Sequence, residues 1–182
     1  MTCRGLLAAG LLAVALLTGM LPAAGQVNFD FMPDGGKGLL TRLVGEQSID
    51  LADIVAQRRD RAGWRDYLAG RGGLTDSEVE TLAGYLSVNL PLPERELAAG
   101  GDLSALLPRD GRELAVANCQ TCHSIFTGYL MQQRNAQGWR SIFLSPFHRE
   151  LAMSETERET FVLYSAANMP LDYEAVPPEL RF

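Results

Sequence analysis

The sequence predicts an all-α protein built from two similar helical halves that follow one another along the chain. Residues 57–65 and 132–140 match in order, and each segment ends in Gly-Trp-Arg around one of the only two tryptophans. A Ser/Thr-x-x-Glu pattern, which starts helices, follows the tryptophan in both halves. No sustained alternation of polar and apolar residues indicates a strand. A match of this length with a nearly constant offset predicts an internal duplication.

Each half is expected to end in a helix that begins with a capping box. The boxes start at Thr75 and Ser154. Apolar residues then recur at helical spacing; they are Leu82, Tyr85 and Leu86 in the first half, and Phe161 and Tyr164 in the second. An Asn-apolar-Pro triplet, at 89–91 and again at 168–170, is predicted to end each helix because proline cannot continue one.

Other elements complete this organisation. A short helix is expected from Gly111 to Asn118. The tryptophans are expected in the core because they occupy the same place in both halves. Tyr85 and Tyr164 are expected where the first and last helices of each half cross. The chain is therefore predicted to begin with a signal peptide at residues 1–25, followed by a first half at 26–95. A linker at 96–108 and a second half at 109–182 complete it.

The N-terminal segment has the pattern of a secretory signal. Arg4 is the only charge in the first 29 residues, and a Leu/Ala-rich run and small residues follow it. This pattern predicts cleavage before Gln26. An uncleaved membrane anchor is the alternative, because residues 5–25 are nearly long enough to span a bilayer. Either way the chain is expected to be exported, with a periplasmic location.

Charge narrows the classes of partner. The chain has 16 Lys and Arg against 22 Asp and Glu, a formal net charge of −6. No basic run suggests nucleic-acid binding. The acidic balance favours encounter with a protein that presents a locally basic face.

The C-x-x-C-H motif formed by Cys119, Cys122 and His123 carries the strongest chemical signal. It predicts covalent attachment of one c-type haem through two thioethers, with His123 as the proximal iron ligand. Cys3 is the only other cysteine and lies in the predicted signal. A thiol redox pair would be expected within a βαβ pattern. A structural zinc site needs four ligands, and the only other histidine is His148.

The first half has no such motif. Projecting the two cysteines and the histidine back onto it gives roughly Leu43, Glu46 and Gln47. None of these side chains can attach or ligate haem. The first half is therefore interpreted as a haem-less copy of the second.

Residues 109–171 resemble the class I cytochromes c of bacterial periplasms. Gly111 precedes Cys119 by eight residues, and the motif, the Gly-Trp pair, the capping box and a tyrosine-bearing last helix follow in that family's order. The likeness extends to cytochrome subunits of periplasmic dehydrogenases, such as those of sulfite dehydrogenase and quinohaemoprotein amine dehydrogenase. The second of these has two cytochrome-like halves.

The resemblance implies an electron carrier with one covalent haem c rather than an enzyme. Its partner would be a periplasmic dehydrogenase or oxidase. Two other functions stay open: an obligate haem subunit of a dehydrogenase complex, and a haem-based gas sensor or peroxidase with an open distal site.

The sixth iron ligand departs from the family. The family usually places a methionine about seven residues after the tryptophan, where this chain has Pro146. His148 and Met153 are nearly equal candidates to replace it, with a slight preference for His148. Met169 is third, and Met131 lies too close to the motif. A five-coordinate iron is also compatible with the sequence.

Arginines near the motif offer one further interaction. Arg134 or Arg140 could pair with a haem propionate, because the guanidinium group suits carboxylates.

Overall fold

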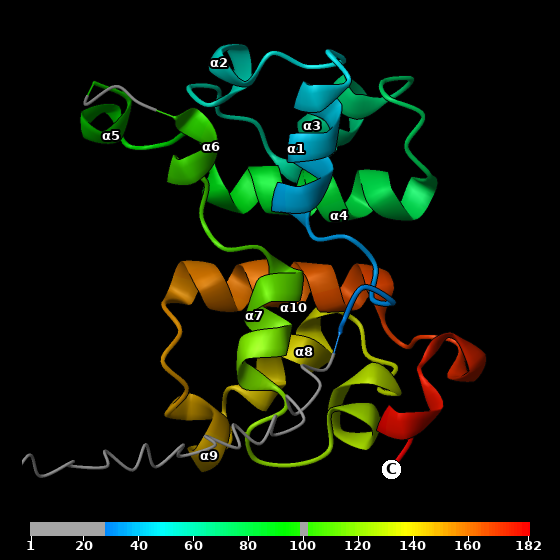
Figure 1. The fold of residues 1–182 in the computed structure, drawn as a ribbon. Coiled ribbons are helices and arrows are strands. Elements are labelled where there is room, and N and C mark those ends of the chain that lie inside the picture. The colour runs from blue at the N-terminus through cyan, green and yellow to red at the C-terminus, as the bar shows by residue number, and fades with distance from the viewer. Residues whose placement is uncertain (1–27, 99–101) are drawn as a thin grey trace, which may run out of the picture.

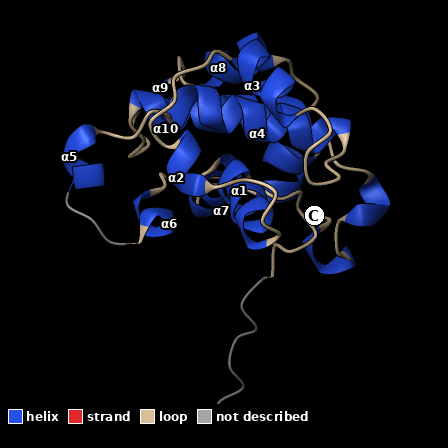
Figure 2. Ribbon diagram, turned by 90° about the horizontal axis from the view of Figure 1, so that it is seen from above, coloured by secondary structure: helices blue, strands red, loops and turns tan. Residues whose placement is uncertain are grey.

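The computed structural model describes residues 28–98 and 102–182. Within these ranges the chain forms helices and no strand, so the all-α prediction is confirmed (Figure 2). None of the helices in these ranges is long and apolar enough to cross a membrane. The predicted signal peptide at 1–25 and the linker residues 99–101 lie outside the described residues.

The first group of helices surrounds one apolar core, in the upper half of Figure 1. It consists of α1 (Gly36–Gly45), α2 (Leu51–Ile54), α3 (Arg61–Leu68) and α4 (Asp76–Asn89). The fully buried side chains at its centre include Leu39, Leu43, Trp64, Leu82 and Leu86. These four helices and the core that they surround are called the first unit below.

The second group surrounds a second core, in the lower half of Figure 1. It consists of α7 (Gly111–Asn118), a π-helical turn (Phe126–Leu130), α8 (Ala136–Ile142), α9 (Pro146–Arg149) and α10 (Glu155–Asn168). Two short 3-10 turns follow, at Tyr173–Ala175 and Pro178–Leu180. The core side chains include Leu114, Tyr129, Leu130, Trp139 and Phe161. This group is called the second unit below.

Two short helices connect the units, α5 (Glu94–Ala98) and α6 (Leu103–Leu106). Leu107 follows them and is buried in the core of the first unit. The connection therefore packs on the first unit where its side chains are described.

The local patterns of the sequence appear where they were expected. Capping boxes open α4 at Thr75 and α10 at Ser154, and the two helices end at Asn89 and Asn168. Helix α7 has the predicted bounds.

The first and last helices of each unit meet without space for a side chain. A Cβ atom on Gly36 would overlap the side chain of Tyr85, and one on Gly111 would overlap Tyr164. Glycine is therefore required at both contacts. Both tyrosines lie at the helix crossings, as predicted.

Helices α4 and α10 pack side by side and join the two units (Figures 1 and 2). The Asn89 amide donates to the Thr160 hydroxyl at 2.9 Å, and the Asn168 amide donates to the Thr81 hydroxyl at 2.8 Å. These two bonds satisfy polar side chains of one helix with polar side chains of the other.

Asp110 also ties the units together. It is 3 % exposed and caps α7 by accepting from the backbone N–H of Glu113 at 3.0 Å. Its other oxygen accepts from the N–H groups of Lys37 and Gly38, at the start of α1. One carboxyl group thus satisfies backbone donors at the N-termini of two helices.

Candidate functional site

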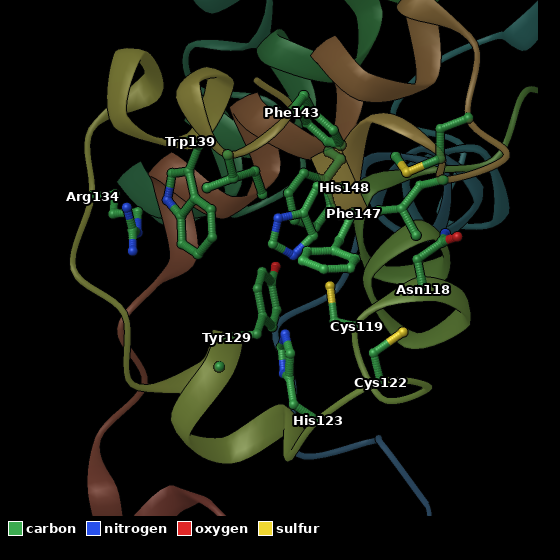
Figure 3. Close-up of a pocket in the computed structure, with 15 residues that line it drawn as sticks. Asn118, Cys119, Cys122, His123, Tyr129, Arg134, Trp139, Phe143, Phe147 and His148 are labelled. Carbon is green, nitrogen blue, oxygen red and sulfur yellow. The ribbon is translucent and has the colours of Figure 1, made fainter. Parts of the chain in front are cut away.

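The C-x-x-C-H residues lie where α7 ends. The Cys119 N–H closes the last turn of α7 by donating to the Ala115 carbonyl at 2.8 Å. The chain then turns through Cys122 and His123 into the π-helical turn. Both cysteines are free thiols, and Figure 3 shows them beside His123 around one cavity. The structure therefore brings the three predicted attachment residues together.

The cavity has a volume of about 300 Å³ and a mostly apolar, aromatic wall. Its lining comes from every helix of the second unit: Asn118, Cys119, Cys122, His123, Gly128, Tyr129, Arg134, Trp139, Ile142, Phe143, Phe147, His148, Leu151, Met153 and Phe161. A concave apolar wall with a few convergent polar groups is typical of cofactor sites.

His123 is held from two sides. Its Nδ1 lies 3.3 Å from the carbonyl oxygen of Ser124. Gly128, in the π-helical turn, packs so closely that a Cβ atom there would overlap the imidazole ring. The imidazole ring thus packs against the backbone at Gly128, and any side chain at that position would occupy the space of the ring.

His148 enters the cavity from α9, opposite His123 (Figure 3). The centres of the two imidazole rings are 6.3 Å apart, and the ring planes make an angle of 81°. The His148 Nδ1 lies 2.9 Å from the Ser145 hydroxyl, which also caps α9. His148 is half-buried in this position.

The methionines considered as distal iron ligands occupy different places. Met153 is 8 % exposed, belongs to the core of the second unit and lines the cavity. Met169 is buried in the same core, and Met131 packs partly buried against it. Neither of these two is among the residues that line the cavity.

The thiol environment bears on the alternative of a redox pair. Burial raises the pKa of the Cys119 thiol to about 12. Reactive redox cysteines have lowered pKa values, because the thiolate is the nucleophile. The environment of Cys119 has the opposite effect.

The zinc alternative requires four ligands around one point. Across residues 28–98 and 102–182, no three His, Cys, Asp or Glu side chains gather closely enough to hold a metal ion.

The arginines differ in their availability. Arg140 binds Glu159 through two hydrogen bonds, one of them 2.8 Å long from Nε. Arg134 lines the cavity, with its guanidinium 5.8 Å from the centre of the Trp139 ring. Of the two predicted propionate partners, Arg134 is the one at the cavity.

The tryptophan indoles do not indicate a cofactor. The Nε1 atoms of Trp64 and Trp139 are both buried without a hydrogen-bond partner. Because Trp64 lies in the unit without the motif, an unpartnered indole also occurs away from the motif. Both tryptophans are core residues, as predicted.

Sequence reasoning missed Gly128 and Ser145. A signal for Ser145 was present, since Ser-Pro is a typical N-cap and first position of a helix. That pattern places His148 three residues after the cap, where the serine can reach it. Gly128 had no comparable local signal, because its contact with His123 depends on the π-helical turn.

Comparison with protein-family models, curated proteins and solved structures gave no match.

Proposed function

We propose that this chain is a c-type cytochrome that transfers electrons in the periplasm through one covalently bound haem. The observation that carries the proposal is the C-x-x-C-H motif at an apolar, aromatic cavity. The donor set fits the group, because two thiols and an imidazole border one wall and a second imidazole faces them.

Each part of the site has a role in this function. Cys119 and Cys122 would form the two thioethers, and His123 would be the proximal ligand. Gly128 and the Ser124 carbonyl orient the His123 ring. Bound haem supplies reversible one-electron chemistry, while the protein sets ligation, burial and docking. The chain itself is proposed to transform no substrate.

We also infer that the two units are copies of one cytochrome c-like frame. Gly36 and Gly111 make the same contact with a tyrosine, and they are 75 residues apart, as are Trp64 and Trp139. Two backbone bonds also correspond: Leu92 N–H donates to the Val55 carbonyl, and Leu171 N–H donates to the Leu130 carbonyl. The two acceptors are 75 residues apart, and the two donors are 79 residues apart, as are the two capping boxes.

This register supports a first unit that holds no haem. It aligns the two cysteines and the histidine with residues one position later than the sequence suggested: Val44, Gln47 and Ser48. None of them carries a thiol or an imidazole. The proposed role of the first unit is a scaffold, because α4 supports α10 along its length.

One observation favours the obligate-subunit alternative. Leu144 and Phe147 are 72 % and 88 % exposed, and Phe147 also lines the cavity. Large exposed apolar side chains next to a redox site suit a stable partner interface. Co-purification of a dehydrogenase with the exported protein would favour a permanent subunit over a free carrier.

The test is haem attachment in cells that mature c-type cytochromes. We expect a haem-stained band on a denaturing gel, and its loss in the double variant Cys119→Ala, Cys122→Ala. The matched control is Gln120→Ala with Thr121→Ala, which changes the motif's spacer and should keep the band. Haem that extracts from the unmodified protein into acidic organic solvent would overturn the proposal.

A further inference from the structure

We propose that His148 is the distal iron ligand and that Ser145 positions its ring for this role. The inference rests on the proposed haem function and deepens it, because it identifies the second axial position. It also decides against an open distal site for sensing or peroxidase chemistry.

The spacing of the two imidazoles suits two ligands of one metal ion. Metal-to-imidazole bonds are about 2 Å long. A metal that bound one nitrogen of each facing ring would therefore hold the ring centres about 6 Å apart. The observed separation between His123 and His148 is 6.3 Å, and the rings reach into the cavity from opposite sides (Figure 3).

Both imidazole rings use Nδ1 for a contact with the protein. The His123 Nδ1 is beside the Ser124 carbonyl, and the His148 Nδ1 is 2.9 Å from the Ser145 hydroxyl. Each Nε2 is then the atom left to bind a metal. Ligating histidines commonly engage the other ring nitrogen in this way, which fixes the tautomer and the ring orientation.

The short helix that carries His148 is well anchored. The hydroxyl of Ser145 caps it, and Pro146 occupies its first position. The Arg149 guanidinium donates to the Leu144 carbonyl at 3.1 Å, and Arg158 of α10 donates to the Arg149 carbonyl at 2.7 Å. A four-residue helix with these contacts can hold a ligand in place.

The second unit is longer than the first between its tryptophan and its capping box. Ser154 follows Thr75 by 79 residues, whereas Trp139 follows Trp64 by 75, so four residues are added between the tryptophan and the capping box. Helix α9 lies in this interval. In the first unit, α3 ends at Leu68, and the chain from there to Thr75 contains three glycines with positive φ and no further helix. The extra length and His148 therefore occur in the unit that has the motif.

Packing accounts for Met153 but not for His148. Met153 precedes the α10 cap as Leu74 precedes the α4 cap, and both pack against the core of their own unit. His148 is half-buried, and its contacts are with Ser145 and the cavity. A role for its ring in the cavity explains this orientation.

The experiment compares the matured protein with His148→Ala and Met153→Leu. We expect covalent haem in all three. The unmodified protein and Met153→Leu should be low-spin and should not bind carbon monoxide when reduced. His148→Ala should become high-spin in the ferric state and bind carbon monoxide. A His148→Ala protein that stays low-spin and inert to carbon monoxide would overturn the proposal.

A second measurement needs no variant. Nearly perpendicular imidazole planes give a low-spin ferric EPR signal of large anisotropy, and we expect this signal for the unmodified protein. A sulfur-to-iron charge-transfer band in its far-red spectrum would instead assign the ligand to methionine. Lack of covalent haem would be a failure of the proposed function and not of the distal assignment.

The role of Ser145 is tested by Ser145→Ala, with Ser145→Thr as the conservative variant. We expect a high-spin fraction in the alanine variant between those of the unmodified protein and His148→Ala, and its reversal by threonine. Ser141→Ala is the matched control, because its hydroxyl bonds only the Gly138 carbonyl. Identical spectra for both alanine variants would reject a positioning role for Ser145.

Discussion

In both units a glycine of the first helix packs against a tyrosine of the last helix, but the side chains near these contacts differ. In the first unit, Leu43 is fully buried and occupies the space next to Gly72. In the second unit, Asn118, which matches Leu43 in the proposed register, lines the cavity together with thiols, imidazoles and aromatic rings. A buried leucine thus fills this place in the first unit, whereas the second unit has a cavity lined by the motif.

The largest expected loss of stability is at the glycine–tyrosine contacts between the first and last helices of each unit. Gly36→Ala and Gly111→Ala should each destabilise the protein by about 4 kcal/mol, above the usual range for an overpacked site, because backbone must move. Chemical denaturation measures both. Gly45→Ala is the control, since a Cβ atom there would meet nothing within 4 Å. A tolerated alanine at one crossing and not the other would break the equivalence of the two units.

The different interiors predict unequal costs for equivalent side chains. Leu43→Ala should cost about 3 kcal/mol, because it opens a cavity in a packed core. Asn118→Ala should cost about 1 kcal/mol, since it removes one hydrogen bond to the Leu114 carbonyl. Denaturation midpoints of the matured variants test the difference. Equal losses would show that the first unit is no better filled than the second.

The interface of α4 and α10 predicts smaller, paired effects. Asn89→Ala and Asn168→Ala should each cost about 1–2 kcal/mol, because a threonine hydroxyl on the other helix loses its donor. The buried Asn89 should cost more than the half-buried Asn168. The double variant should be additive within error in denaturation, because the two bonds share no residue.

The smallest expected effect is a loss of stability in acid, to which the glutamates of both capping boxes contribute in the same direction. Burial raises the pKa of Glu78, but hydrogen bonds from the Thr75 N–H and from Arg42 outweigh it and lower the pKa below its ordinary value. The Ser154 N–H and Arg109 likewise lower the pKa of Glu157 against the effect of burial. Because the pKa of each carboxyl is lower in the folded state, its carboxylate form stabilises the protein above the ordinary pKa of 4.5. This stabilisation is lost as the pH falls below that value.

The pH dependence of the unfolding free energy measures this effect. Glu78→Gln and Glu157→Gln should each flatten the loss of stability on the acid side. A variant whose acid-side slope equals that of the unmodified protein would show that its carboxylate is not coupled to folding.

Most of the local structure could be predicted because its causes are local. The boxes at Thr75 and Ser154, the bounds of α7 and the ends of α4 and α10 follow from residues three or four apart. The burial of both tryptophans followed from their equivalent places in the two halves. The contacts that could not be predicted join distant residues, such as Asp110 with the start of α1.

Local features of the sequence are enough to predict that this chain is helical and that two thiols and a histidine stand together at the end of one helix. Those features depend on spacing within a few residues, which the chain carries without tertiary structure. The tertiary structure decided what faces the motif. It placed His148 across the cavity from His123, because α9 is anchored by contacts with α10 rather than by its own length. It also set the two units against each other, since α4 and α10 exchange hydrogen bonds between residues more than 70 positions apart.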